Sequence, residues 1–143
     1  APARIYRGRE VGKVIRIMGR GATGNGVHGH APHGPNRTDL RQGYNRIDSA
    51  EGRWIDYTFD APPAALALEA SAGNGDSGGP ILIAVGGEWR VAGIMSWKRV
   101  EGSIARFHPG KYGQVNVGLR LANYREWITQ TMAAGGPCVS AQC

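Results

Sequence analysis

The hydrophobic positions of the chain fall into short runs that are separated by clusters of glycine and proline. Two runs, at residues 11–18 and 91–95, are rich in β-branched side chains, which favour strands over helices. The dipeptide Gly86-Gly87 stands between two further runs and fits the two-residue turn of a β-hairpin. The pattern predicts strands over residues 12–18, 43–48, 53–59, 65–69, 80–85, 88–97 and 114–119.

A stretch near the end of the chain has helical periodicity instead. Its apolar stripe consists of Leu121, Tyr124, Trp127, Ile128, Thr131 and Met132. Asn123 stands three residues before Glu126 and resembles a capping box, and the sequence Gly135-Gly136-Pro137 ends the helix. The two patterns together predict an all-β chain, an antiparallel barrel or sandwich, with a C-terminal helix packed back on the strands.

Composition and charge narrow the class of protein. The chain has 143 residues, of which 41% are hydrophobic and 20% charged, as expected for one globular domain. No apolar run approaches the length of a membrane-spanning helix, so we expect no membrane partner. The net charge is +6, but the basic residues alternate with apolar ones and form no run, so no nucleic-acid partner is expected. The residues concerned are Arg4, Arg7, Arg9, Lys13, Arg16 and Arg20.

Both cysteines, Cys138 and Cys143, lie at the end of the chain. Their C-x4-C spacing fits neither a zinc ribbon nor a redox C-x-x-C motif. We therefore interpret them as a local disulfide of an exported protein, secreted or periplasmic, with two free thiols as the alternative. No signal peptide is visible at Ala1, as in an already processed secreted chain.

The stretch Gly75-Asp76-Ser77-Gly78-Gly79-Pro80 carries the chemistry. A serine hydroxyl is a weak nucleophile that needs a base, and its tetrahedral intermediate needs donors for an oxyanion. The neighbouring glycines allow a tight turn and bring bare N–H groups close to a substrate. The same letters satisfy the G-x-S-x-G elbow of α/β-hydrolases, but that motif requires a following helix, whereas Pro80 and a strand-like run follow here.

This hexapeptide resembles the nucleophile signature of chymotrypsin/trypsin-like serine proteases. Segments 10–21, 91–97 and 119–128 resemble further family segments, and order and spacing agree over residues 5–130. The resemblance implies a single antiparallel Greek-key β-barrel, the second barrel of the chymotrypsin-like fold, with a C-terminal α-helix. It divides the chain into a linker remnant at residues 1–4, the barrel with its helix at 5–134, and a Gly/Pro/Cys tail at 135–143.

The resemblance also implies roles for individual residues. Ser77 would be the nucleophile, the N–H groups of Gly75 and Ser77 would form the oxyanion hole, and Asp76 would pair with a new amino terminus after activation. The substrate-binding residues would be Ser71 at the base of the specificity pocket, a wall formed by Ser96, Trp97 and Lys98, and Asn116 on the other side of the pocket. Asn74 would also bind substrate.

Two residues depart from the family pattern. Ser71 is not the Asp that selects Arg or Lys, so a basic specificity is not supported. Lys98 replaces a glycine at the pocket mouth, where it would narrow the pocket or favour acidic groups. The cysteines that usually flank the nucleophile loop are also absent.

In this family the catalytic His and Asp come from a first barrel, whose Ala-Ala-His-Cys fingerprint does not occur here. The resemblance therefore implies a serine endopeptidase that acts on a protein or peptide only with a partner, either an N-terminal β-barrel chain of the same protease or a self-associated dimer. We expect this chain to be inactive alone and to use no cofactor. A protease-like binding module without catalysis is the alternative.

The long loop at residues 19–37 holds three histidines, His28, His30 and His33. A dyad of Ser77 with His28 or His30 and a weak zinc site formed by the three histidines are both open alternatives. A flexible His/Gly loop is the favoured interpretation. His108, beside Pro109 and Gly110, is interpreted as a turn residue.

Overall fold

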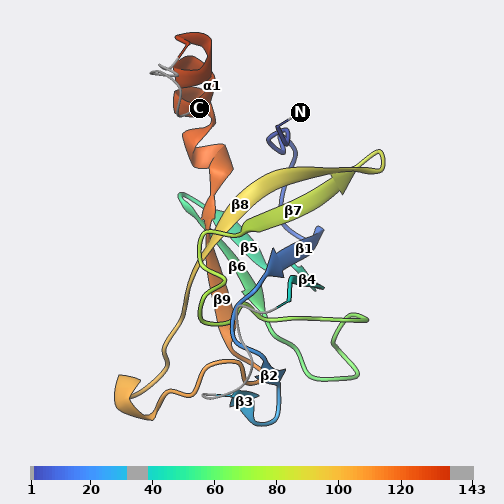
Figure 1. Cartoon of the computed structure of the whole chain (residues 1–143), viewed down its shortest axis with the longest axis vertical. Helices are drawn as coiled ribbons and strands as arrows, with labels where there is room; N and C mark the ends of the chain where they lie inside the picture. Colours follow the sequence, from blue (N-terminus) through green and yellow to red (C-terminus); the bar gives the residue numbers. More distant parts are fainter. Residues whose placement is uncertain (1, 32–38, 136–143) are drawn as a thin grey trace.

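The computed structural model describes residues 2–31 and 39–135 (Figure 1). His33, both cysteines and their predicted disulfide lie outside the described residues. The longer strands are β1 (Val14–Gly19), β4 (Arg41–Arg46), β6 (Trp54–Thr58), β7 (Pro80–Val85), β8 (Glu88–Lys98) and β9 (Val115–Arg120). The short elements are β2 (Gly24–Asn25), β3 (Gly29–His30), β5 (Ser49–Glu51), the 3-10 turns η1 (Ile104–Arg106) and η2 (Leu121–Tyr124), and helix α1 (Arg125–Ala133).

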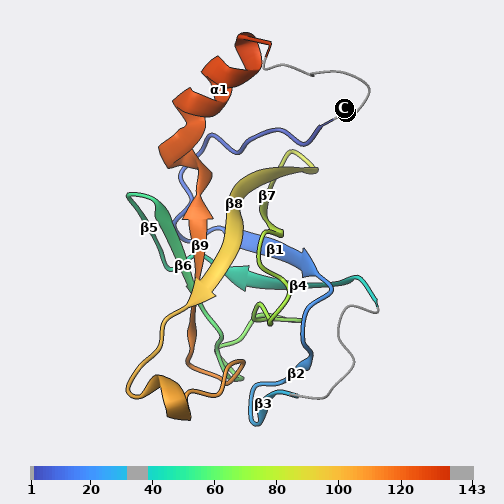
Figure 2. The same ribbon diagram turned by 60° about the vertical axis from the view of Figure 1, so that its left-hand side comes forward.

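Seven strands form one antiparallel sheet in the order β4-β1-β7-β8-β9-β6-β5, and β2 pairs with β3 separately. The large sheet curls, so that β4 at one end of the order contacts β6 near the other end. The prediction of an all-β, antiparallel barrel-like chain with a C-terminal helix is confirmed (Figure 2). Six of the seven predicted strands are present, with ends that differ by at most two residues.

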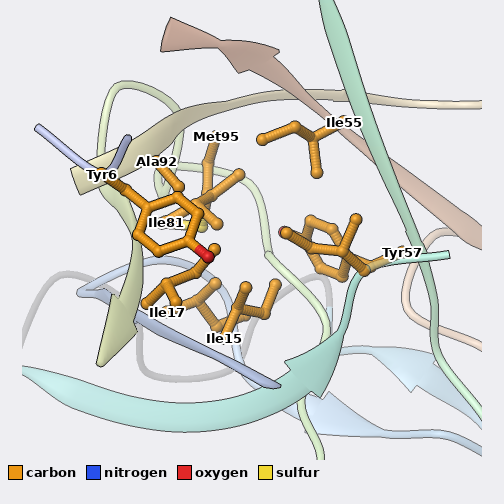
Figure 3. Close-up of a cluster of buried hydrophobic side chains, with 10 residues drawn as sticks. Tyr6, Ile15, Ile17, Ile55, Tyr57, Ile81, Ala92 and Met95 are labelled. Atoms are coloured by element: carbon orange, nitrogen blue, oxygen red, sulfur yellow. The ribbon is translucent and has the colours of Figure 1, made fainter. Parts of the chain in front are cut away.

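The core lies on the concave face of this curled sheet. Ile15 and Ile17 of β1 are buried, and so are Ile55 and Tyr57 of β6, because alternate residues of a strand point to the same face. Figure 3 shows these side chains converging with Ile81 of β7. The alternation that the sequence displays therefore sets which face of the sheet is buried.

The predicted strand at residues 65–69 is wrong. Leu68 has a φ of +56°, which is incompatible with an extended strand, and its side chain is 78% exposed. The Glu69 carboxylate accepts the N–H groups of Asp60 at 2.6 Å and Leu66 at 2.7 Å. The bond to Leu66 satisfies a backbone donor of this stretch that a sheet would otherwise pair, and Glu69 contacts β4 through an isolated bridge to Tyr44.

The C-terminal helix differs from the prediction in two respects. The apolar stripe begins in η2, which contacts β8, and α1 starts only at Arg125, without a side-chain cap from Asn123. The helix also does not pack back on the strands, because Trp127 and Met132 are 66% and 69% exposed. Figures 1 and 2 show α1 extending beyond the end of the sheet. The stripe thus meets the sheet through η2, while Trp127, Thr131 and Met132 of α1 are exposed and Ile128 is half-buried.

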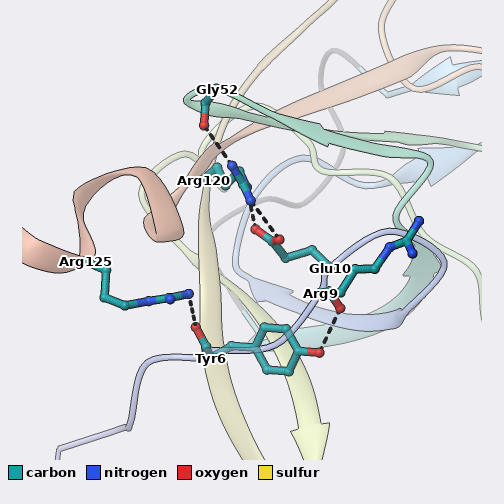
Figure 4. A network of polar contacts seen from close by, with 6 residues as sticks. All are labelled: Tyr6, Arg9, Glu10, Gly52, Arg120 and Arg125. Atoms are coloured by element: carbon teal, nitrogen blue, oxygen red, sulfur yellow. Dashed lines mark hydrogen bonds and ion pairs between the residues drawn. The ribbon is translucent and has the colours of Figure 1, made fainter.

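A buried ion pair ties the segment before β1 to the end of β9 (Figure 4). Glu10 is 4% exposed and accepts two hydrogen bonds from the Arg120 guanidinium, at 2.6 and 3.1 Å. Arg120 also donates to the carbonyl of Gly52, and Arg125 donates to the carbonyl of Tyr6. In residues 2–31 and 39–135, no helix has the length and apolar character needed to cross a bilayer.

Candidate functional site

The loop that carries Ser77 docks against β8 directly before β7 begins. Gly78 donates its N–H to the carbonyl of Met95 at 2.9 Å, and Met95 donates to the carbonyl of Gly79 at 2.8 Å. Strand β8 bulges between Met95 and Trp97, so that Ser96 has no partner residue on β9. The Ser77 hydroxyl donates to the Ser96 carbonyl at 3.3 Å. The bulge thus brings the serine and the extra backbone residue together, as bulges near functional sites do.

Two backbone N–H groups, those of Gly75 and Ser77, lie in the same loop as this hydroxyl. Asp76 donates to the carbonyl of Gly73, and Gly79 donates to that of Asp76, both at 3.0 Å. Within the part of the chain that the structure describes, the N–H groups of Gly75 and Ser77 have no acceptor. Gly75 has a φ of +97°, which a residue with a Cβ rarely adopts. The site therefore presents two free donors for an oxygen that carries negative charge.

The Asp76 carboxylate lies in a cradle of glycines. Its Oδ1 accepts the Gly21 N–H at 2.7 Å, and its Oδ2 accepts the Gly73 N–H at 2.8 Å. A Cβ on Gly19 would stand 1.9 Å from Oδ1, and one on Gly21 would stand 2.5 Å from the carboxyl carbon. Glycines at positions 19 and 21 are therefore needed for this close approach. From the sequence alone, this segment shows only a resemblance to the family. The pairing of Asp76 with a new amino terminus stays a prediction.

A cavity of about 390 Å³ adjoins this carboxylate. Gly21, Ser71, Asp76 and Met95 are among the residues that line it, together with His30 from the histidine-containing loop. Asp76 thus faces a space rather than packed side chains on one side. The cavity offers room for a further group next to a carboxylate whose two backbone bonds fix its orientation.

Ser71, which also lines this cavity, forms a hydrogen-bonded cluster with Lys98 and Asn116. Lys98 and Asn116 are register partners on β8 and β9, and the Lys98 ammonium donates to Asn116 Oδ1. The ammonium also donates to Ser71 Oγ at 2.6 Å, and Ser71 donates to Asn116 Oδ1 at 3.0 Å. Asn116 is 1% exposed and is further fixed by its bond to the Tyr57 carbonyl.

Burial lowers the pKa of Lys98 to about 8, although the Asp76 carboxylate opposes this shift. Among the described residues, no carboxylate lies within 4 Å of the ammonium. Both acceptors of Lys98 are neutral side chains. The cluster therefore holds a partly desolvated cation without a counterion.

The two remaining candidates lie at the rim of the site. Trp97 is 45% exposed and stacks edge-on against Trp54, with ring centroids 5.8 Å apart. The Asn74 carbonyl accepts the Ala22 N–H at 2.8 Å, which ties the nucleophile loop to the segment after β1, while the Asn74 residue itself is exposed. The structure thus brings the predicted substrate-binding residues around one loop and one strand end.

His28 and His30 contact groups other than the Ser77 hydroxyl. His28 is exposed and its ring contacts Asn25 Oδ1 at 3.2 Å. His30 is 9% exposed, burial lowers its pKa, and its carbonyl contacts the ring of His108 at 3.0 Å. In the described ranges, neither His28 nor His30 is a hydrogen-bond partner of Ser77, and no three His, Cys, Asp or Glu residues gather as a metal site. The His30–His108 contact was not predicted, since 78 residues separate the two positions.

Comparison with known proteins adds an independent line of evidence. The family model named Trypsin matches residues 3–128. Transmembrane protease serine 5 of Homo sapiens is 40% identical over 62 residues, which cover 43% of this chain and 12% of that protein. CLIP domain-containing serine protease B14 of Anopheles gambiae is 38% identical over 64 residues, which cover 43% of this chain and 15% of that protein. The chain therefore corresponds to a small part of each of these relatives.

Proposed function

The chain belongs to the trypsin family, and on that premise we propose that it supplies the nucleophile half of the active site of a serine endopeptidase. Ser77 attacks the carbonyl carbon of a peptide bond, and the N–H groups of Gly75 and Ser77 donate to the resulting oxyanion. The observation that carries the proposal is the pair of N–H groups that have no acceptor among residues 2–31 and 39–135, beside a hydroxyl that is docked on β8.

The general base and its orienting acid come from another segment. The Ser77 hydroxyl donates to the Ser96 carbonyl, which cannot take up a proton. An N-terminal β-barrel chain of the same protease, or a second copy in a dimer, supplies the histidine that receives this proton and returns it to the leaving amine. Without that partner the chain retains the oxyanion donors but not the activated nucleophile.

Substrate binding uses the surroundings of the bulge. A protein or peptide substrate lies along Ser96 and Trp97, with Asn74 at the rim, and inserts one side chain toward Ser71 and Asn116. Activation uses the cavity beside Asp76, which has room for an amino terminus next to the carboxylate. The proposed setting is the exterior of the cell or the periplasm, in keeping with the sequence-based prediction that Cys138 and Cys143 form a local disulfide.

A binding module without catalysis is the second candidate. The bond of Ser77 to a carbonyl rather than to a base supports it, because a hydroxyl held in this way is not activated.

Labelling with a fluorophosphonate probe separates the two candidates. The full-length protein that contains this chain, with any partner chain retained, is treated with the probe and the labelled peptide is identified by mass spectrometry. We expect labelling at Ser77 and its loss in Ser77→Ala, while the exposed-serine control Ser103→Ala is labelled normally. Folded protein that takes up no label at Ser77 would contradict the endopeptidase and favour the binding module.

A further inference from the structure

We propose that Lys98, held in its hydrogen-bonded cluster with Ser71 and Asn116, makes the proposed substrate site selective for an acidic side chain, so that the residue before the cleaved bond is aspartate or glutamate. The inference rests on the proposed function, because it assigns the substrate class of that same site. It specifies the second of the two effects predicted from the sequence, a preference for acidic groups, and uses the first, a narrowed pocket, as its geometric argument.

The first argument is geometric. Lys98 lies at the end of β8 and its ammonium reaches Ser71 Oγ, so its aliphatic stem crosses the space between them. A long basic substrate side chain would meet both this stem and a like charge. A short acidic side chain can instead bind with its carboxylate at the ammonium, because it does not have to extend past the Lys98 side chain.

The second argument concerns unused donors. An ammonium has three N–H donors, and Lys98 uses two of them, toward Ser71 Oγ and Asn116 Oδ1. Its third donor has no acceptor in the part of the chain that the structure describes. Ser71 carries a hydroxyl that can turn from Asn116 to an incoming oxygen. The cluster therefore offers two donors to a carboxylate, while the Asp76 carboxylate, which lines the adjoining cavity, is not hydrogen-bonded to the ammonium.

The third argument is electrostatic. The ammonium is partly desolvated, and both of its acceptors are neutral. The charged and titratable groups that act on it are Asp76 and His30, neither of which is its hydrogen-bond partner. A bound carboxylate would form a charge-assisted hydrogen bond in a site already removed from water, where such a bond is stronger than at the surface. The uncharged isosteres asparagine and glutamine fill the same volume without this gain.

Cleavage kinetics test the selectivity. Full-length protein is assayed with fluorogenic peptides that differ only in the residue before the cleaved bond: Asp, Glu, Asn, Gln, Arg or Leu. We expect kcat/KM for Asp and Glu to exceed that for Asn and Gln by about tenfold or more, which corresponds to one charge-assisted hydrogen bond. Lys98→Gln should abolish this ratio, whereas the exposed-lysine control Lys111→Gln should preserve it. Equal rates for acids and amides, or preference for Arg, would overturn the proposal.

Peptide binding gives a readout that needs no catalytic base. Product-type peptides that end in Asp, Glu, Asn or Gln are titrated calorimetrically into the Ser77→Ala protein, in which the remaining pocket is intact. Tighter binding of the acidic peptides that disappears in Lys98→Met supports the inference even where no substrate is cleaved, in which case only the endopeptidase proposal fails. Equal affinity for acids and amides in a protein that cleaves peptides overturns the inference alone.

Discussion

The site contains two charged groups, the Asp76 carboxylate and the Lys98 ammonium, whose hydrogen-bond partners differ in kind. Asp76 is held by backbone N–H groups of Gly21 and Gly73, which cannot turn away. Lys98 is held by the side chains of Ser71 and Asn116, of which the Ser71 hydroxyl can rotate toward a ligand. Fixed backbone donors position a loop, whereas exchangeable side-chain acceptors leave a charge available for binding.

The glycines make the difference between the two regions possible. A side chain at position 19 or 21 would occupy the place of the Asp76 carboxylate, so the cradle exists only because both residues are glycine. Position 98, by contrast, carries a long side chain that fills the space in front of Ser71. The surroundings of Asp76 therefore depend on the absence of side chains at two glycines, whereas the surroundings of Ser71 depend on the long side chain of Lys98.

The largest change in stability is expected when the Asp76 carboxylate is removed. Asp76→Ala removes the acceptor of two backbone N–H groups in a partly buried site, and should lower the free energy of unfolding by about 2–4 kcal/mol. The matched control is Asp48→Ala, whose carboxylate accepts the Thr58 N–H at an exposed position and whose loss should cost about 1 kcal/mol or less. Urea denaturation measures both variants. Equal losses would show that the cradle does not anchor the loop.

The next effect tests whether the glycines serve the carboxylate. Gly21→Ala places a Cβ against Asp76 and should lower the free energy of unfolding by about 1–3 kcal/mol. In an Asp76→Ala background the obstacle is gone, so the same substitution should cost at least about 1 kcal/mol less. A double-mutant cycle by urea denaturation gives the coupling. Additive costs would mean that Gly21 is required for another reason.

The smallest change in stability is expected for removal of the Lys98 ammonium, which should stabilise the protein rather than destabilise it. Lys98→Met should raise the free energy of unfolding at pH 7 by about 1 kcal/mol, because it removes a desolvated cation, with a discount for partial exposure. In the folded wild type the pKa of Lys98 is about 8, below its ordinary value of 10.5. Below pH 8 Lys98 is protonated in both the folded and the unfolded protein, so the full cost of burying the charged ammonium lowers the stability of the wild type.

Between pH 8 and 10.5 the folded wild type loses the proton first, so its stability rises relative to Lys98→Met. The groups that act on this titration are Asp76, which raises the pKa of Lys98, and His30. Urea denaturation of both proteins at pH 7 and pH 10 tests the trend. A constant difference between them would show that Lys98 is solvated.

The sequence predicts the strands well where alternation and β-branched residues coincide, as at Ile15 and Ile17. It fails at residues 65–69, because the same apolar composition occurs in a turn that the Glu69 side chain caps. It also fails for the surroundings of α1, since the 3-10 winding of η2 cannot be read from helical spacing. Local pattern thus predicts elements, while side-chain caps and winding decide how they end.

For the site, the motif resemblance predicts which residues take part but not their contacts. The Ser77–Ser96 bond depends on a bulge, and the Lys98–Asn116 bond depends on the register of β8 with β9. Both are long-range backbone properties that no local sequence pattern encodes. The proposed roles of Ser77, Gly75 and Asp76 remain predictions that the experiments above address.

A direct measurement of the Lys98 titration tests the central claim, that this ammonium is desolvated and lacks a counterion. Protein with ¹³C-labelled lysine is titrated by NMR, and the Lys98 signal is assigned by its absence from Lys98→Gln. The account predicts a midpoint near pH 8 that moves upward when a peptide ending in Asp is bound, because a carboxylate favours the protonated form. A midpoint near 10.5 that no acidic peptide displaces would contradict it.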